Sequence, residues 1–113
     1  MFRDLGDRYA QAPPLHNIGY SHHHLGRYDL AVCYYRQTLD LLREFGDRYN
    51  QAFALTHLGE SYLAVGDQSA AHDAWQQALA ILQELDHADA EQVQNKLAQF
   101  HTPTDDRLRE QST

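Results

Sequence analysis

The feature that most constrains the fold of this chain is a repeat with a period of 40 residues. The stretch RDLGDRYAQA at 3–12 returns as REFGDRYNQA at 43–52. The match continues at the same offset further along the chain, where Gly19 pairs with Gly59. A self-similar chain of this kind builds one supersecondary unit more than once, and neighbouring units bury their apolar faces against each other.

Within each copy, the apolar residues follow the spacing of an α-helix. Leu55, Leu58 and Tyr62 are separated by three and four residues, which places them on one helical face. Gly66, just past this run, suits the left-handed backbone that ends a helix, and Asp67 or Ser69 can cap the next helix. Each copy is therefore predicted to be two helices joined by a tight turn. The expected helices lie near residues 13–25, 28–45, 48–65, 68–85 and 89–100.

The predicted fold class is all-α, with tandem helix-turn-helix repeats in an α-solenoid: two repeats plus a C-terminal capping helix. Proline is tolerated in the first turn of a helix but not further in. The pair Pro13-Pro14 therefore predicts that the first helix begins later than its counterpart. We expect one domain over residues 1–101 and a flexible polar tail over 102–113. Within this domain the repeats are expected at about 8–46 and 47–86, and the capping helix at about 89–100.

Composition narrows the range of partners. The formal net charge is -7, with only nine Lys and Arg, which opposes the phosphate neutralisation that nucleic-acid binding requires. No apolar run reaches the length of about 18 residues that predicts a transmembrane helix. The single cysteine, Cys33, leaves no intramolecular disulfide and suits a reducing compartment. We therefore expect a cytoplasmic protein that binds neither nucleic acid nor a membrane.

The pattern of small and large residues resembles the tetratricopeptide repeat. The residues of the second copy that carry the resemblance are Leu55, Leu58, Gly59, Tyr62, Gly66, Ala71, Trp75, Ala78 and Leu79. The first copy departs from the pattern at two positions, where His22 stands for a large aromatic residue and Thr38 for a small one. The resemblance implies a non-catalytic module, without a cofactor, that binds a protein or peptide partner.

A narrower resemblance comes from the 40-residue period, the LGDR linker and the last predicted helix. These features are similar to the C-terminal repeat arrays of actinobacterial antibiotic-regulatory transcriptional regulators with a nucleotide-binding switch domain of the NB-ARC type. This similarity implies a sensing or partner-docking segment of a signalling protein. The chain itself shows no P-loop and no DNA-binding helix-turn-helix motif.

The tetratricopeptide resemblance also implies that the first helix of each pair lines a concave groove. By position, the groove residues are His16, Asn17, Tyr20, His23, His24, Thr56, His57, Glu60 and Leu63. The best-known peptide-binding members hold a C-terminal carboxylate with Lys, Arg and Asn at such positions, and only Asn17 resembles these. A neutral to acidic groove instead favours a peptide or helix of aromatic or basic character.

Three consecutive histidines at 22–24 suggest a metal site, but adjacent helical residues point in three directions and cannot all bind one ion. We expect His22 to fill an aromatic core position and its two neighbours to be partly exposed. An alternative function uses other groove histidines. Two to four imidazoles, among them His16, His24 and His57, could bind zinc or nickel together with the carboxylate of Glu60. The same histidines could instead charge the groove near pH 6.5. A metal- or pH-responsive binding module is therefore the alternative interpretation.

No residue pattern predicts catalysis. Cys33 lies beside tyrosines that are expected in the core, and we interpret it as a buried or half-buried structural thiol. Ser61 follows a packing glycine and is interpreted as a tolerated small residue. No two carboxylates form a convincing acid–base pair. We therefore predict that the chain is not an enzyme.

Such arrays normally need about three repeats for stability, and this chain has two. The end before the first predicted helix has no cap, which leaves Phe2, Leu5 and Tyr9 without a surface to pack on. This end could pack on an upstream repeat or on another copy of the chain. We expect self-association as a homodimer through these residues, with or without exchange of a helix.

Overall fold

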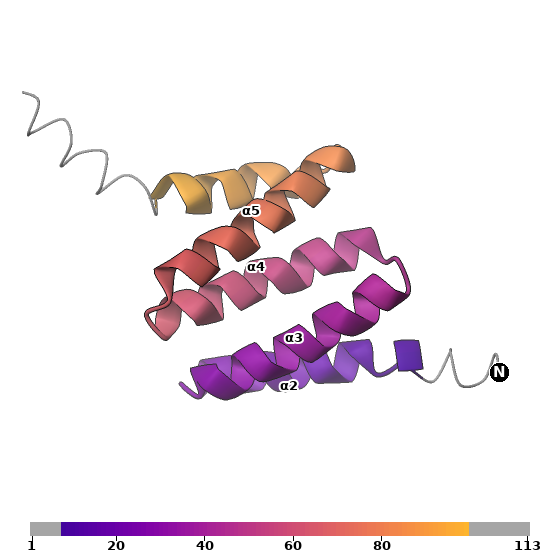
Figure 1. The fold of residues 1–113 in the computed structure, drawn as a ribbon, viewed down its shortest axis with the longest axis vertical. Helices are drawn as coiled ribbons and strands as arrows, with labels where there is room; N and C mark the ends of the chain where they lie inside the picture. Colours follow the sequence, from indigo (N-terminus) through magenta and orange to yellow (C-terminus); the bar gives the residue numbers. More distant parts are fainter. Residues whose placement is uncertain (1–7, 100–113) are drawn as a thin grey trace, which may run out of the picture.

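The computed structural model describes residues 8–99, which form a stack of helices that turn back on one another (Figure 1). The labelled helices are α2 (Ala12–His24), α3 (Tyr28–Glu44), α4 (Arg48–Ala64) and α5 (Gln68–Glu84). A further helix covers residues 89–99. Successive labelled helices pack against each other, and residues 8–99 contain no strand. The predicted all-α repeat fold is confirmed, and each labelled helix begins and ends within one residue of its predicted bounds.

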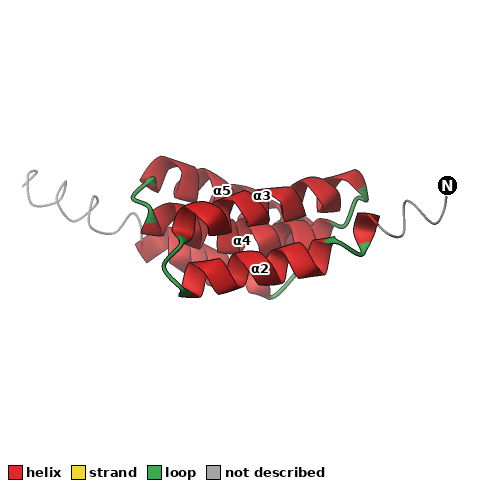
Figure 2. Ribbon diagram, turned by 90° about the horizontal axis from the view of Figure 1, so that it is seen from below, coloured by secondary structure: helices red, strands yellow, loops and turns green. Residues whose placement is uncertain are grey.

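The helices lie in two layers, with α3 and α5 on one side and α2 and α4 on the other (Figure 2). The main core lies between the layers and contains Tyr35, Leu55, Trp75 and Leu82. Val93 in the helix at 89–99 belongs to the same cluster, so this helix covers the end of the stack beside α5 (Figure 1). Residues 1–7 and 100–113 lie outside the description, and with them Phe2, Leu5 and the predicted tail.

Glycine and aspartate set the end of one helix and the start of the next. Gly66 has a φ of 90°, a left-handed conformation that glycine adopts without strain. Its N–H and that of Asp67 donate to the carbonyls of Leu63 and Tyr62, at 3.0 and 2.9 Å. The Asp67 carboxylate then accepts from the Ala70 N–H at 3.1 Å and caps α5. The predicted roles of Gly66 and Asp67 are both confirmed.

The two prolines delay the start of α2. Its counterpart α4 begins at Arg48, which corresponds to Arg8 at the 40-residue offset, whereas α2 begins at Ala12 with Pro13 in the first turn. Proline is compatible with a first turn because the N–H that it lacks has no partner within the helix there. The late start that the sequence predicts is therefore confirmed.

A ring on the second helix of each repeat packs against a glycine on the first. Trp75 lies over Gly59, and a Cβ on this glycine would come within 2.4 Å of the Trp75 indole nitrogen. Tyr35 lies over Gly19 in the same way, and a Cβ there would come within 3.0 Å of its ring. Both rings are buried in the core. The glycines therefore allow the two helices of each repeat to approach closely.

We expected from the sequence that Tyr9 would have no surface to pack on, but in the structure it has one. Its ring packs edge-on against Phe45 at a centroid distance of 5.2 Å, and its hydroxyl donates to the Asp47 carboxylate. The second repeat makes an equivalent contact, from the Tyr49 hydroxyl to Asp89 at 3.1 Å. Phe45 and Asp47 both lie at the turn that follows α3, so Tyr9 joins the first repeat to the second.

We predict that Gly59→Ala lowers the free energy of unfolding by up to about 2 kcal/mol. Overpacking against Trp75 costs about 1–3 kcal/mol, and the higher helix propensity of alanine returns about 1 kcal/mol. The matched change Gly19→Ala should lower stability by less than about 1 kcal/mol, because its contact with Tyr35 is longer. Urea denaturation followed by circular dichroism measures both, and equal losses would contradict the proposed packing.

Candidate binding groove

A cluster of aromatic and imidazole rings closes the space between α2 and α4. His16 of α2 stacks on Phe53 of α4 at a centroid distance of 4.9 Å. It meets His57 edge-on at 5.0 Å and lies 5.1 Å from the ring of Tyr35, which comes from α3. These rings join the first helices of the two repeats, so the repeats present one continuous wall.

The ring cluster continues along α2 toward its C-terminus. Tyr20 lies 4.2 Å from His24 and 6.1 Å from His57, measured between ring centroids. Tyr20 and Phe53 are both exposed, whereas His16 and His57 are half-buried between them. The exposed rings therefore offer apolar surface to a ligand, and the half-buried imidazoles support them.

Burial keeps the central imidazoles uncharged. Burial, and to a smaller extent the neighbouring His57, lower the pKa of His16 from 6.5 to about 4. Burial also lowers the pKa of His57, although the Glu60 carboxylate, 3.9 Å away, acts in the opposite direction. The expectation that the groove gains charge near pH 6.5 is therefore wrong for these two residues, because a half-buried imidazolium is poorly solvated.

A cleft of about 240 Å³ lies beside the ring cluster, where the N-terminal halves of α2 and α4 face each other. Its lining contains no Asp, Glu, Lys or Arg. A cleft of this size is below the roughly 300 Å³ at which pockets for drug-sized ligands begin, and it suits one large side chain of a peptide. The lining residues are Tyr9, Ala12, Pro13, His16, Asn17, Thr38, Leu42, Asn50 and Phe53.

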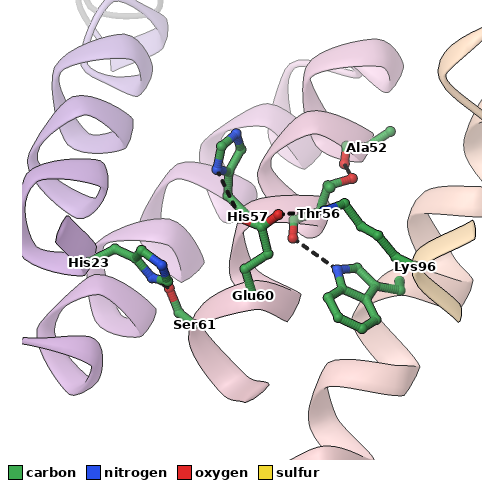
Figure 3. A network of polar contacts seen from close by, with 8 residues as sticks. His23, Ala52, Thr56, His57, Glu60, Ser61 and Lys96 are labelled. Carbon is green, nitrogen blue, oxygen red and sulfur yellow. Dashed lines mark hydrogen bonds and ion pairs between the residues drawn. The ribbon is translucent and has the colours of Figure 1, made fainter. Parts of the chain in front are cut away.

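A second cleft, of about 220 Å³, lies between α4 and the helix at 89–99, on the other side of Phe53. This cleft is more polar, because Glu60 on its rim forms a 2.7 Å ion pair with Lys96 (Figure 3). Thr56 also lines it, with a hydroxyl that donates to the Ala52 carbonyl at 2.9 Å. The carbonyl of Thr56 accepts from the Trp75 indole N–H at 3.0 Å. A third hollow, which contains Leu63, adjoins Glu60.

The three consecutive histidines point in different directions, and each has a different environment. His22 stacks on Tyr34 at 5.4 Å, and its buried Nδ1 has no hydrogen-bond partner within the described part of the chain. The Nδ1 of His23 lies 2.8 Å from the hydroxyl of Ser61 (Figure 3). His24 is exposed beside Tyr20. The triplet therefore does not form one site.

Two residues have roles that the sequence interpretation missed. Ser61 is fully buried and hydrogen-bonds to His23 across the repeats, so it is more than a tolerated small residue. A polar residue inside an apolar helical run was the available signal, because buried hydroxyls require a partner. Cys33 is exposed, contrary to prediction, since it shares the outer face of α3 with Gln37, which donates to its sulfur at 3.4 Å.

The described residues also limit the chemistry of the groove. Across residues 8–99, no group of three or more His, Cys, Asp and Glu side chains is arranged to hold a metal ion. In the same part of the chain, every helix is too short or too polar to cross a membrane. The groove offers rings and amides to a ligand in the first cleft, and the charged side chains of Glu60, Asp89 and Lys96 in the second.

The stacked helix pairs and the open groove define an α-helical repeat protein. The chain belongs to the tetratricopeptide repeat family, whose model matches residues 5–84. No curated protein matches the chain. Tetratricopeptide repeats bind protein partners, and their fold is typical of non-catalytic interaction modules. The family that the sequence resembles is thereby confirmed.

We predict that acid destabilises the fold through His16. Its pKa is about 4 in the folded chain and 6.5 in the unfolded chain, so protons bind the unfolded chain more tightly. The stability is therefore complete above pH 6.5 and falls between pH 6.5 and pH 4. His16→Phe should reduce this loss without abolishing it, because His57 retains its own lowered pKa. Thermal unfolding at pH 7 and pH 4.5 measures the difference.

The matched control for this prediction is His24→Phe, because His24 lies on the same helix but is exposed. This variant should keep the acid sensitivity of the natural chain. An unchanged pH dependence in His16→Phe would show that the ring cluster does not exclude charge.

Proposed function

We propose that the chain binds a segment of a partner protein in the groove along α2 and α4, and that one aromatic or large aliphatic side chain of this segment enters the 240 Å³ cleft. The observation that carries the proposal is the uncharged ring lining of this cleft, in which His16 has a pKa of about 4. A cleft without full charges favours an apolar anchor, because a charged side chain would lose its hydration without gaining a partner.

The exposed rings provide the rest of the recognition surface. Phe53 lines both the first and the second cleft, so a bound segment that covers it reaches both. Asn17, on the rim of the first cleft, has an amide that can donate to and accept from a peptide backbone. Glu60 lines the second cleft and favours a basic residue next to the anchor, in keeping with the aromatic or basic character expected from the sequence.

The test is to select peptides from a random display library against the whole chain and to measure their affinity by calorimetry. Phe53→Ala should weaken binding about tenfold, because it removes about 1.5 kcal/mol of apolar contact. Selected sequences should share an aromatic or large aliphatic residue. Leu85→Ala is the matched control, since Leu85 is an equally exposed apolar residue outside the clefts. Equal effects of the two substitutions would overturn the proposal.

We propose a non-catalytic role in the cytoplasm, within or derived from a bacterial signalling or transcriptional regulator. The 40-residue period and the LGDR linker support this origin, and the net charge of -7 supports a module that contacts protein rather than nucleic acid. The alternative, a metal- or pH-responsive module, has weaker support. The described groove residues form no group of three metal ligands, and the lowered pKa values of His16 and His57 move their protonation below neutral pH.

A further inference from the structure

The 40-residue repeat makes it possible to compare the same helical face in two settings. On α4, the face at positions 51, 54, 58 and 61 is buried. On α2, the counterparts at positions 11, 14, 18 and 21 are all exposed. The contrast is largest for the apolar pair, since Leu58 is 4% exposed and Ile18 is 40% exposed. One face of the repeat is therefore covered in the second copy and open in the first.

The contacts of α4 show what normally covers this face. Gln51 donates to the Leu42 carbonyl near the end of α3 at 3.2 Å. Leu58 lies in one core cluster with Tyr35 and Leu39 of α3. The covering element is thus a helix that belongs to the neighbouring repeat. The same face of α2 has the shape and chemistry to pack on a helix, but the described chain places none there.

The open face extends over both helices of the first repeat. Leu25 and Leu30 are exposed on either side of the turn between α2 and α3. On α2, His22 lies one turn beyond Ile18, and on α3, Tyr34 lies one turn beyond Leu30. The rings of His22 and Tyr34 stack on each other. These residues link Ile18 to the two leucines in one patch, which we call the α2 face: Pro14, Ile18, Leu25, Leu30 and Tyr34.

The absence of charged side chains sets helix α2 apart from the other labelled helices. Helix α2, with the sequence APPLHNIGYSHHH, contains no Asp, Glu, Lys or Arg. The chain as a whole has a net charge of -7, so two copies repel each other over most of their surface. They can approach along α2 without bringing carboxylates together.

We propose that the α2 face pairs with the α2 face of a second copy of this chain, in a symmetric dimer. In such an interface, each Ile18 packs against apolar residues of the same patch on the partner. The residues of the proposed groove on α2, among them His16 and Tyr20, lie outside this stripe. The dimer therefore does not depend on the proposed groove function, and either proposal can fail without the other.

The test is the absolute mass of the chain by light scattering after size-exclusion chromatography, over a concentration series. The natural chain should rise from 13.0 kDa toward twice that mass. Ile18→Glu should stay at 13.0 kDa over the same range, because it places two carboxylates in the interface. Leu30→Glu, on the neighbouring helix, should act in the same direction.

Leu85→Glu is the matched control, since Leu85 is 42% exposed, close to Ile18, but lies at the end of α5. It should dimerise as the natural chain does, and so should the groove variant Phe53→Ala. Circular dichroism should show equal helix content in all variants, because the substituted side chains are exposed. A natural chain that is monomeric at every concentration, or a dimer that Leu85→Glu dissociates equally, would overturn the proposal.

Hydrogen exchange of the natural chain provides a second measurement that needs no substitution. Amide protection in α2 should increase when the protein concentration rises, whereas protection in the helix at 89–99 should not change. An increase confined to residues 89–99 would place the interface at the other end of the stack and would contradict the proposal.

Discussion

The close packing of a ring on a glycine within each repeat is the contact on which the rest of the structure depends. Trp75 leaves no room for a Cβ at Gly59, and Tyr35 leaves little at Gly19. This contact sets the distance between the two helices of a pair. Because both pairs share this spacing, the second helix of one repeat can pack against the first helix of the next, and the groove residues of α2 and α4 face the same side.

The groove follows from that arrangement. With α2 and α4 in one layer, His16, Phe53 and His57 meet between them, and burial there lowers the pKa of both imidazoles below the ordinary value of 6.5. An uncharged wall with exposed rings attracts apolar side chains, and the Glu60–Lys96 pair adds polarity only at one end. The family indicates the class of function, which is the binding of a protein. The ring lining supports our proposal that the bound segment carries an aromatic or large aliphatic side chain.

The sequence predicted the local structure well because local chemistry determines it. Glycine after an apolar helical run ends α2, α3 and α4, aspartate caps α4 and α5, and Pro13 delays α2. The 40-residue offset likewise pairs the two core rings, Tyr35 and Trp75. These features depend on neighbours within a few residues or on the 40-residue offset, and both kinds of relation are visible in the sequence.

The features that the sequence did not predict are contacts between side chains on different helices. The hydrogen bonds between Ser61 and His23 and between Tyr9 and Asp47 each join residues 38 apart, so no local pattern reveals them. Cys33 was expected to be buried because its neighbours are tyrosines, but helical rotation places it on the outer face. The lowered pKa of His16 arises from burial by Phe53 and Tyr35, which come from other helices.

The central claim is that an uncharged ring cluster joins the two repeats into one groove wall. An NMR titration of the His16 imidazole from pH 8 to pH 3.5, with the ring carbon signals assigned by comparison with His16→Phe, tests it most directly. The account predicts that His16 stays neutral until the pH approaches 4 and that its neighbours Phe53 and Tyr35 shift in the same pH range. A His16 signal that titrates near pH 6.5, with no response from Phe53, would show an open and hydrated groove and would contradict the account.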